Sequence, residues 1–210
     1  MKKILIVDDH EVLREGVKKL FNDRDGETIF GEAGTAQEAL RLVTEQDWDL
    51  AVLDLSLGGR GGLDVLKELK RIRPRVPVLI FSMHSEEPYV RRALKAGAAG
   101  YVIKTSPRGE LMKAIETVIG GGKYVSSALT ETLITSFERD TDQLPHELLS
   151  DREFEVMRLI ASGKTVREIS ALLSLSDKTI STYRARLLEK MGMKTNAELT
   201  HFAIKNKLVE

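Results

Sequence analysis

Cysteine, long apolar runs and net charge are all missing from this sequence. Without cysteine the chain can form no disulfide and no zinc–thiolate site, and it has no cysteine nucleophile. No apolar stretch approaches the roughly 18 residues that a membrane span requires. The apolar run near the N-terminus is also too short for a signal peptide. We therefore expect a cytoplasmic protein that does not contact a membrane.

The charge balance does not point to nucleic acid or to a membrane surface by itself. The 32 basic residues equal the 32 acidic residues, and only the part beyond Pro145 has a slight basic excess. The sign of that excess suits a nucleic-acid-binding C-terminal part, but its size decides nothing. A chain of 210 residues has room for two small domains, each with its own core.

Apolar strands and amphipathic helices alternate five times in the first 120 residues. The spacing predicts strands at 3–7, 28–33, 49–54, 77–81 and 100–103, with helices following each at 11–21, from 36, 62–72, 86–96 and 107–119. This alternation predicts an α/β fold with a doubly wound, five-stranded parallel sheet.

The remainder of the chain has helical spacing throughout. We expect helices at 151–161, 165–173, 177–190 and 196–206. Between the two parts, Ser, Thr and Asp mix with short apolar pairs, which indicates a linker with one helix around 127–138. The expected organisation is therefore an α/β domain at 1–121, a linker at 122–146 and a small all-α four-helix domain at 147–210.

Polar side chains stand where the apolar strands end: Asp8, Asp9, Asp54, Ser82 and Lys104. If the strands are parallel, these groups meet at one edge of the sheet. Three carboxylates there repel one another unless a cation lies among them, and hard oxygen ligands favour Mg²⁺. A carboxylate beside Mg²⁺ and a lysine can attack a phosphoryl group. Any one of these acids taken alone is explained as well by a strand-end or capping role.

The first 120 residues resemble the flavodoxin-like receiver domain of two-component response regulators. The matching motifs are Val7-Asp8-Asp9, Leu53-Asp54-Leu55 followed by Gly62, Phe81-Ser82, and Tyr101-Val-Ile-Lys104. The order and spacing of these motifs are highly specific.

The resemblance implies that Asp54 accepts a phosphoryl group from a cognate histidine kinase. Asp9, Asp54 and the backbone carbonyl of Ser56 would hold Mg²⁺, and Asp8 would act through water. Lys104 would pair with the phosphate.

Ser82 would then move towards the phosphate, and Tyr101 matches the aromatic position that swings inward with it. Packing on the adjacent helix explains Tyr101 equally well. Gly58 replaces the usual proline of the family, which predicts a looser loop. His10 follows the acidic pair, and we expect it to be solvated and to point away from the pocket.

The helices at 165–173 and 177–190 have the proportions of a helix-turn-helix. Apolar residues of the second helix give it an inward face, and short polar and basic residues lie largely on the other faces: Lys178, Ser181, Thr182, Arg184, Ala185 and Arg186. Such side chains suit a major groove. An ordinary amphipathic helix with a solvated basic face is the alternative.

Residues 148–208 resemble the LuxR-type four-helix DNA-binding domain. The resemblance is carried by Leu149 to Met157, Ile160-Ala-Ser-Gly163, Arg167-Glu-Ile169, Leu173 and Thr179-Ile180. It implies that 177–190 is the recognition helix and that the last helix pairs two domains.

The individual roles follow from that resemblance. Base contacts are expected among Ser181, Thr182 and Arg184, although Tyr183 replaces a common histidine nearby. Phosphate contacts are expected at Lys178, Arg186 and Lys190. The residues expected to pair two copies are Leu199, Phe202 and Ala203.

A receiver followed by a LuxR-type domain is the layout of NarL/FixJ-type response regulators. We therefore expect a transcriptional regulator, not an enzyme, that binds double-stranded promoter DNA as a homodimer. Phosphorylation either unmasks the recognition helix or builds a dimer through the receivers, and the sequence leaves both open. A regulator that acts only through protein contacts is the main alternative. An aspartyl-phosphate phosphohydrolase usually has a second Asp two residues after its nucleophile, where this chain has Ser56. A nucleotide-binding enzyme would need a glycine-rich motif after the first strand, where this chain has acidic residues. Neither enzyme class is favoured.

Overall fold

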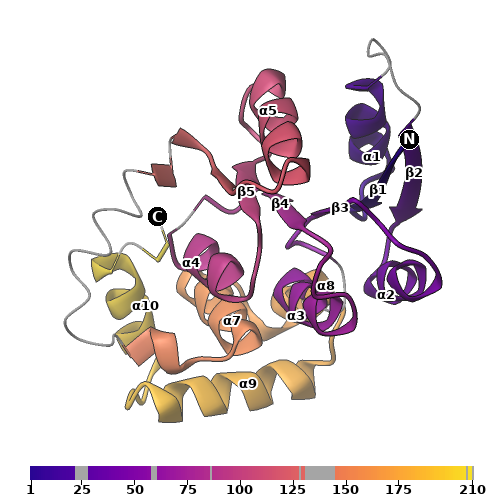
Figure 1. Ribbon diagram of the computed structural model, residues 1–210. Coiled ribbons are helices and arrows are strands. Elements are labelled where there is room, and N and C mark those ends of the chain that lie inside the picture. The colour runs from indigo at the N-terminus through magenta and orange to yellow at the C-terminus, as the bar shows by residue number, and fades with distance from the viewer. Residues whose placement is uncertain are drawn as a thin grey trace. The chain divides into compact units, whose positions relative to one another are not determined.

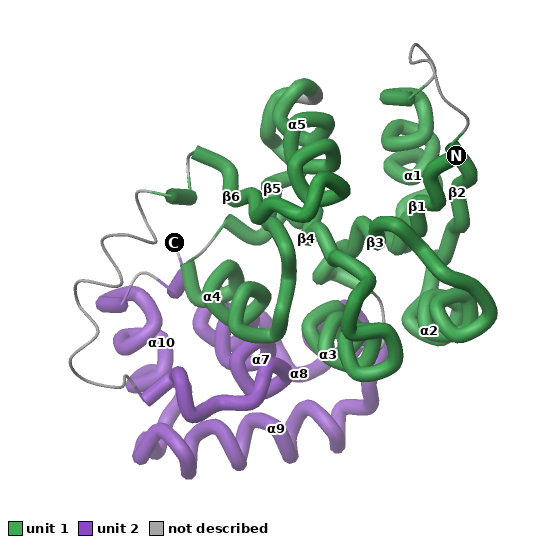
Figure 2. Tube along the Cα trace, viewed as in Figure 1, with its two compact units in different colours: residues 1–138 green, residues 139–210 purple. Residues whose placement is uncertain are grey.

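The chain divides into two compact units in the computed structural model, residues 1–138 and 139–210 (Figure 2). The structure describes residues 1–21, 28–57, 61–85, 87–127, 129–130, 145–206 and 208–209. The expected linker limits at 122–146 stay a prediction, because most of that segment lies outside the described residues. The same holds for the helix expected around 127–138 and for the conformation of the glycine loop at 58–60.

The first unit is built on a six-stranded parallel sheet in the order β2-β1-β3-β4-β5-β6. The strands are β1 Lys2–Val7, β2 Thr28–Ala33, β3 Leu50–Leu53, β4 Val78–Ser82, β5 Gly100–Ile103 and β6 Tyr124–Val125. The first five are the predicted strands. The sixth was not expected, because two residues are too few to give a strand pattern and they fall in the predicted linker.

Five helices cover the two faces of the sheet, with α1 and α5 on one face and α2, α3 and α4 on the other (Figure 1). Their bounds are α1 Glu11–Lys19, α2 Ala36–Glu45, α3 Gly62–Ile72, α4 Glu87–Lys95 and α5 Arg108–Ile119. Neither these helices nor any other described helix is long and apolar enough to cross a membrane.

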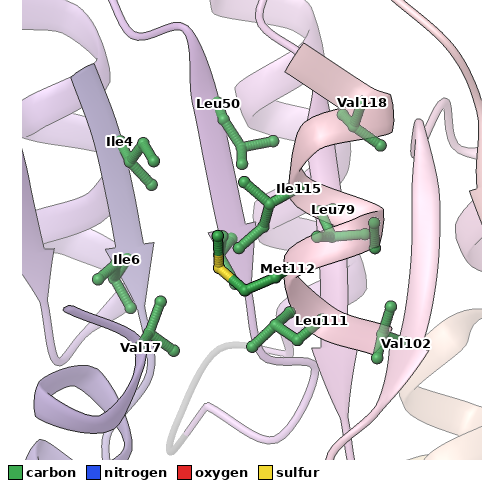
Figure 3. Packing of buried hydrophobic residues seen from close by; sticks show 12 residues of the cluster. Ile4, Ile6, Val17, Leu50, Leu79, Val102, Leu111, Met112, Ile115 and Val118 are labelled. Carbon is green, nitrogen blue, oxygen red and sulfur yellow. The ribbon is translucent and has the colours of Figure 1, made fainter. Parts of the chain in front are cut away.

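The core between the sheet and the α1–α5 layer is made by alternate strand residues. Ile4 and Ile6 of β1 face Met112 and Ile115 of α5 in this cluster (Figure 3). The intervening residues of β1 are buried as well and point to the opposite face, since successive side chains alternate across a strand. A strand with both faces apolar can place polar side chains in a crevice only at its end.

The second unit consists of four helices that follow a short 3₁₀ turn, η1 Pro145–Leu148. They are α7 Asp151–Ala161, α8 Val166–Leu173, α9 Asp177–Lys190 and α10 Asn196–Lys205. Ser150 and Thr165 form capping boxes at the starts of α7 and α8. Ser174 takes a left-handed conformation, φ 52°, and ends α8. This tight turn between α8 and α9 confirms the helix-turn-helix arrangement.

Candidate functional site

Polar side chains from four strand ends meet at the carboxyl edge of the first unit's sheet. Asp8 and Asp9 follow β1, Asp54 follows β3, Ser82 ends β4 and Lys104 follows β5. β1 and β3 are neighbours at the point where the strand order reverses. Parallel sheets open a crevice at that point, so the topology itself brings the predicted residues together.

Lys104 joins two of the carboxylates. Its Nζ lies 2.7 Å from Asp8 Oδ2 and 2.7 Å from Asp54 Oδ2. All three side chains are at least nine-tenths buried, with exposed fractions of 5%, 5% and 1%. Two buried negative charges are therefore held beside one buried positive charge, and their remaining oxygens accept backbone N–H groups. Asp8 Oδ1 accepts from His10 at 2.8 Å and Asp54 Oδ1 from Ser56 at 3.1 Å.

The donor atoms of this pocket suit a divalent cation. One ligand atom from each of Asp8, Asp9, His10 and Asp54 lies within 4.8 Å of all the others. The three carboxylates are hard oxygen donors, which is the ligand type that Mg²⁺ prefers. Asp9 is the exposed member, with 36% of its side chain accessible, so a hydrated ion can reach the cluster from its side.

His10 does not point away from the pocket, contrary to our expectation. Its ring is 66% exposed, as expected for a solvated residue, but Nδ1 lies 2.8 Å from Asp9 Oδ1 and 3.2 Å from Asp8 Oδ1. The backbone bond from His10 to Asp8 turns the start of α1 back over the pocket and carries the ring with it. The sequence signal was the direct adjacency of His10 to the acidic pair.

Ser82 and Tyr101 are connected through one residue, His84, in the β4–α4 connection. Ser82 Oγ accepts the His84 N–H at 3.4 Å, and the Tyr101 hydroxyl donates to the His84 carbonyl at 2.7 Å. Both side chains are fully buried. Tyr101 therefore lies in the inward position, and its hydroxyl has a defined partner in addition to packing contacts.

His84 also reaches the segment after Asp54. Its Nε2 lies 3.3 Å from Ser56 Oγ, and its ring stacks on Tyr89 of α4 with 4.1 Å between ring centroids. Sequence reasoning missed this residue, because a single histidine two positions after a strand-end serine carries no periodic signal.

Arg14 braces the end of β1 from α1. Its Nη1 donates to the backbone carbonyl of Asp8 at 2.7 Å, and its Nε donates to Glu32 Oε2 at 3.0 Å. Lys18 donates to the same Glu32 carboxylate at 2.6 Å. Hydrogen bonds from Lys18 and Arg14 keep the pKa of Glu32 below its ordinary value. Arg14 was also missed, since a basic residue on a helix usually means a solvated face.

In the second unit, α9 presents the predicted polar face to solvent. Lys178, Ser181, Thr182 and Arg186 are exposed. Ile180, Leu187 and Leu188 of the same helix are buried. Thr182 Oγ1 donates to the Lys178 carbonyl at 2.9 Å. This exposed face has the size and chemistry of a major-groove surface.

Two basic residues of α9 are engaged within the unit. Lys190 Nζ donates to Glu153 Oε2 at 2.6 Å, and Arg184 Nε donates to Asn196 Oδ1 at 2.7 Å. The Glu153 side chain is only 4% exposed, so Lys190 balances a buried charge. A phosphate contact by Lys190 would require it to leave that carboxylate.

Two of the three residues predicted to pair two copies lie on the inner side of α10, and the third, Phe202, is half-buried. Leu199 and Ala203 are fully buried on the side of α10 that packs on α7. The Phe202 ring lies 5.9 Å from the His146 ring, centroid to centroid. Their helical spacing marks the face that builds the unit's own core. The residues that α10 exposes are Asn196, Ala197, Glu198, His201, Ile204 and Lys205.

Comparisons with known proteins agree on both units. Residues 4–116 match the response regulator receiver domain, and residues 147–203 match the luxR family of bacterial regulatory proteins. The chain is 34% identical to response regulator GacA of Pseudomonas syringae pv. syringae (strain B728a), over 100% of this chain and 99% of that protein. It is also 34% identical to response regulator UvrY of Escherichia coli (strain K12), over 99% and 96%.

Solved structures give the same picture. A LuxR-family two-component response regulator from Aurantimonas sp. SI85-9A1 is 35% identical, with a TM-score of 0.62, and the match covers 65% of this chain and 97% of that chain. The RcsB response regulator of Salmonella typhimurium is 25% identical, with a TM-score of 0.61, over 96% and 98%. An RcsB–DNA complex is 25% identical, with a TM-score of 0.60, over 96% of each chain.

Proposed function

The chain belongs to the two-component response regulators of the NarL/FixJ type, which join a receiver domain to a LuxR-type DNA-binding domain, and from this membership we propose the roles of its individual residues. It is a phosphorylation-controlled transcription regulator. The family consists of transcriptional response regulators and is generally not enzymatic. Our proposals concern the phosphoryl acceptor, the cation, the switch residues and the DNA and dimer contacts.

Asp54 is the phosphoryl acceptor. A carboxylate oxygen of Asp54 forms a bond to phosphorus while the bond between phosphorus and the imidazole nitrogen of the kinase phosphohistidine breaks. The observation that carries this assignment is the pair of 2.7 Å contacts of Lys104, which reaches the carboxylates of both Asp54 and Asp8. The Lys104 ammonium is therefore placed to pair with the negative charge of the phosphoryl oxygens once Asp54 is phosphorylated.

Asp9, Asp54 and the backbone carbonyl of Ser56 would hold Mg²⁺, with Asp8 acting through water. The clustered carboxylate oxygens fit such an ion. When bound, Mg²⁺ neutralises negative charge on the phosphoryl oxygens. The buried position of Asp54 limits access of water to the acceptor.

Ser82, Lys104 and Tyr101 are the residues that respond to phosphorylation of Asp54. Ser82 would leave its contact with the His84 N–H to donate its hydroxyl to the phosphoryl group. Tyr101 is held by the carbonyl of the same residue, so a shift of His84 acts on both side chains. His84 also stacks on Tyr89, a buried residue of α4, which extends the change to that helix.

The recognition helix is α9. Lys178 and Arg186 are the proposed phosphate contacts, and Ser181, Thr182 and Arg184 are the candidates for base contacts. We now assign Lys190 to the stability of the unit, because it neutralises the buried carboxylate of Glu153. The RcsB–DNA complex supports DNA binding by a protein of the same layout.

Homodimerisation on DNA would use the outer face of α10 instead of Leu199, Phe202 and Ala203. Ala197, His201 and Ile204 are exposed at helical spacing on that face, and Ile204 is a large apolar side chain that is 56% exposed. Pairing two such faces buries apolar surface at the two-fold axis of a palindromic site.

The experiment is a gel shift of promoter DNA with wild-type and Asp54→Asn protein, with and without a small-molecule phosphoryl donor. We expect the donor to change DNA binding of the wild type and to add one phosphoryl group to its mass. Asp54→Asn should lose both responses, and Asp47→Asn, at an exposed position, should keep them. Unchanged donor-dependent binding of Asp54→Asn would remove Asp54 as the acceptor.

A further inference from the structure

The imidazole of His10 faces the same space as the acidic ligands. Its Nδ1 is 2.8 Å from Asp9 Oδ1 and 3.2 Å from Asp8 Oδ1. The ligand atoms of Asp8, Asp9, His10 and Asp54 form one group within 4.8 Å. Three of these residues have a role in the proposed function, and His10 has none.

The distances between His10 Nδ1 and its two carboxylate neighbours are close to the spacing of adjacent ligands around one octahedral ion. Two ligands at right angles, each about 2.1 Å from a metal, lie about 3.0 Å apart. The distances from His10 Nδ1 to the two carboxylates, 2.8 and 3.2 Å, lie on either side of that value. An ion held by Asp9 can therefore be reached by His10 Nδ1 with little movement of either side chain.

A backbone hydrogen bond also holds the His10 ring beside the carboxylates. The His10 N–H donates to Asp8 Oδ1 at 2.8 Å, which anchors the residue at the start of α1. Since the ring is 66% exposed, an ion carrying water can approach it without opening the core.

We propose that His10 is a nitrogen ligand of the divalent cation, so that the phosphorylation pocket binds transition-metal ions such as Mn²⁺, Co²⁺ or Ni²⁺ through Asp9, Asp54 and His10. This proposal rests on the proposed function, because Asp9 and Asp54 are the proposed Mg²⁺ ligands. Imidazole suits the softer transition ions, whose affinity for nitrogen rises from Mn²⁺ to Ni²⁺, whereas Mg²⁺ prefers oxygen. His10 therefore changes which cation the pocket selects and contributes little to Mg²⁺ itself.

A different account is that the ring only donates a hydrogen bond to the carboxylates. In that case its removal would change the affinities for Mg²⁺ and for Ni²⁺ by the same factor. The two accounts therefore differ in selectivity, which can be measured without any phosphorylation assay.

The experiment is calorimetric titration of the full-length protein with Mg²⁺ and with Ni²⁺. His10→Ala is compared with wild type and with Asp47→Asn, which removes an exposed carboxylate in the segment before β3. We expect His10→Ala to weaken Ni²⁺ binding at least about tenfold and to leave Mg²⁺ binding within about twofold. Asp47→Asn should change neither affinity at the pocket.

A spectroscopic readout identifies the ligand directly. Pulsed electron paramagnetic resonance of the Mn²⁺ complex should show coupling to a coordinated nitrogen in the wild type and none in His10→Ala. Nitrogen coupling that persists in His10→Ala, or equal losses for Mg²⁺ and Ni²⁺, would overturn the proposal. If the wild type binds Mg²⁺ but shows no nitrogen coupling, only the role of His10 fails. If it binds no Mg²⁺ at all, the proposed cation site fails with it.

Discussion

At the scale of single residues, Lys104 controls the charge balance of the pocket. It lies 2.7 Å from each of two carboxylates, Asp8 and Asp54, that are almost completely buried. Removing one partner from a buried ion pair leaves an uncompensated charge, which costs far more than the pair contributes. The proposed phosphorylation site is therefore also a site on which the stability of the first unit depends.

We expect Lys104→Met to destabilise the first unit by about 3 kcal/mol in the absence of divalent cations. Mg²⁺ should restore part of this loss, because it binds the carboxylates that have lost their ammonium partner. Urea unfolding followed by fluorescence of Trp48, which is buried in the first unit, measures both effects. Lys113→Met on the exposed side of α5 is the control. An equal loss in Lys113→Met would contradict this account.

Glu153 is the corresponding buried charge of the second unit. Burial acts to raise the pKa of its carboxyl, but hydrogen bonds from Lys190 and from Ser150 hold that pKa below its ordinary value of 4.5. A carboxylate with a lowered pKa in the folded state stabilises the fold above its unfolded pKa. This contribution is lost as the pH falls through the folded-state value.

Glu153→Gln should therefore destabilise the second unit by about 1–3 kcal/mol at neutral pH. The difference between variant and wild type should shrink as the pH is lowered below about 4.5. Hydrogen exchange of the α7 and α9 amides, measured in full-length protein across this pH range, gives the difference in stability between the variant and the wild type. A difference that stays constant down to acidic pH would show that the Glu153 charge is not the cause.

At the scale of elements, the start of α3 is set by close contact with the segment after β3. A Cβ on Gly62 would lie 2.4 Å from Leu55 Cα and 2.5 Å from the Asp54 carbonyl oxygen. Backbone atoms cannot move aside as a flexible side chain would. Gly62 thus lets the helix pack directly beside Asp54, the proposed phosphoryl acceptor.

Gly62→Ala should cost about 1–3 kcal/mol through this overlap and slow phosphorylation of Asp54. Gly16→Ala is a matched control inside α1, where a Cβ meets nothing within 4 Å. That substitution should stabilise the protein by about 0.5–1 kcal/mol, because alanine favours a helix. Thermal unfolding separates the two, and two changes of the same sign would contradict the explanation.

The helix starts show how far local sequence determines an element. Thr35 caps α2, accepting the Glu38 N–H at 3.2 Å. The Glu38 carboxylate, however, accepts from Gly34 at 2.8 Å and not from Thr35. The cap joins residues that are close in sequence. The partner of the Glu38 carboxylate depends instead on the path of the chain from β2 into α2.

At the scale of the whole molecule, function requires that a change at Asp54 alters DNA binding by α9. The family membership supports this coupling. Binding through phosphate contacts is strongly salt-dependent, because each neutralised phosphate releases counterions.

The plot of log affinity against log salt concentration has a negative slope. We expect its magnitude to decrease by about one for each phosphate contact that is lost, which is about two for a substitution present in both subunits of a dimer. Lys178→Ala and Arg186→Ala should each show this change on a DNA duplex selected with the phosphorylated protein. Lys190→Ala should leave the slope unchanged and lower the stability of the second unit. A wild-type slope near zero would favour a regulator that acts through protein contacts alone.

Sequence by itself determined the elements and the list of reactive residues. Short apolar runs and helical spacing predicted five strands and nine helices of the two units, and the strand-end positions predicted that Asp54 and Lys104 would meet. These features are local, or they follow from the single rule that parallel strands end at one edge.

Only the tertiary structure decided how side chains pair across elements. It engaged Lys190 with Glu153, joined His84 to Ser56, and buried Leu199 and Ala203 in their own unit. A helical pattern identifies an apolar face but not what covers that face, and a basic residue carries no local mark of its partner. Burial and pairing are properties of the packed chain, because they depend on residues brought together from distant positions.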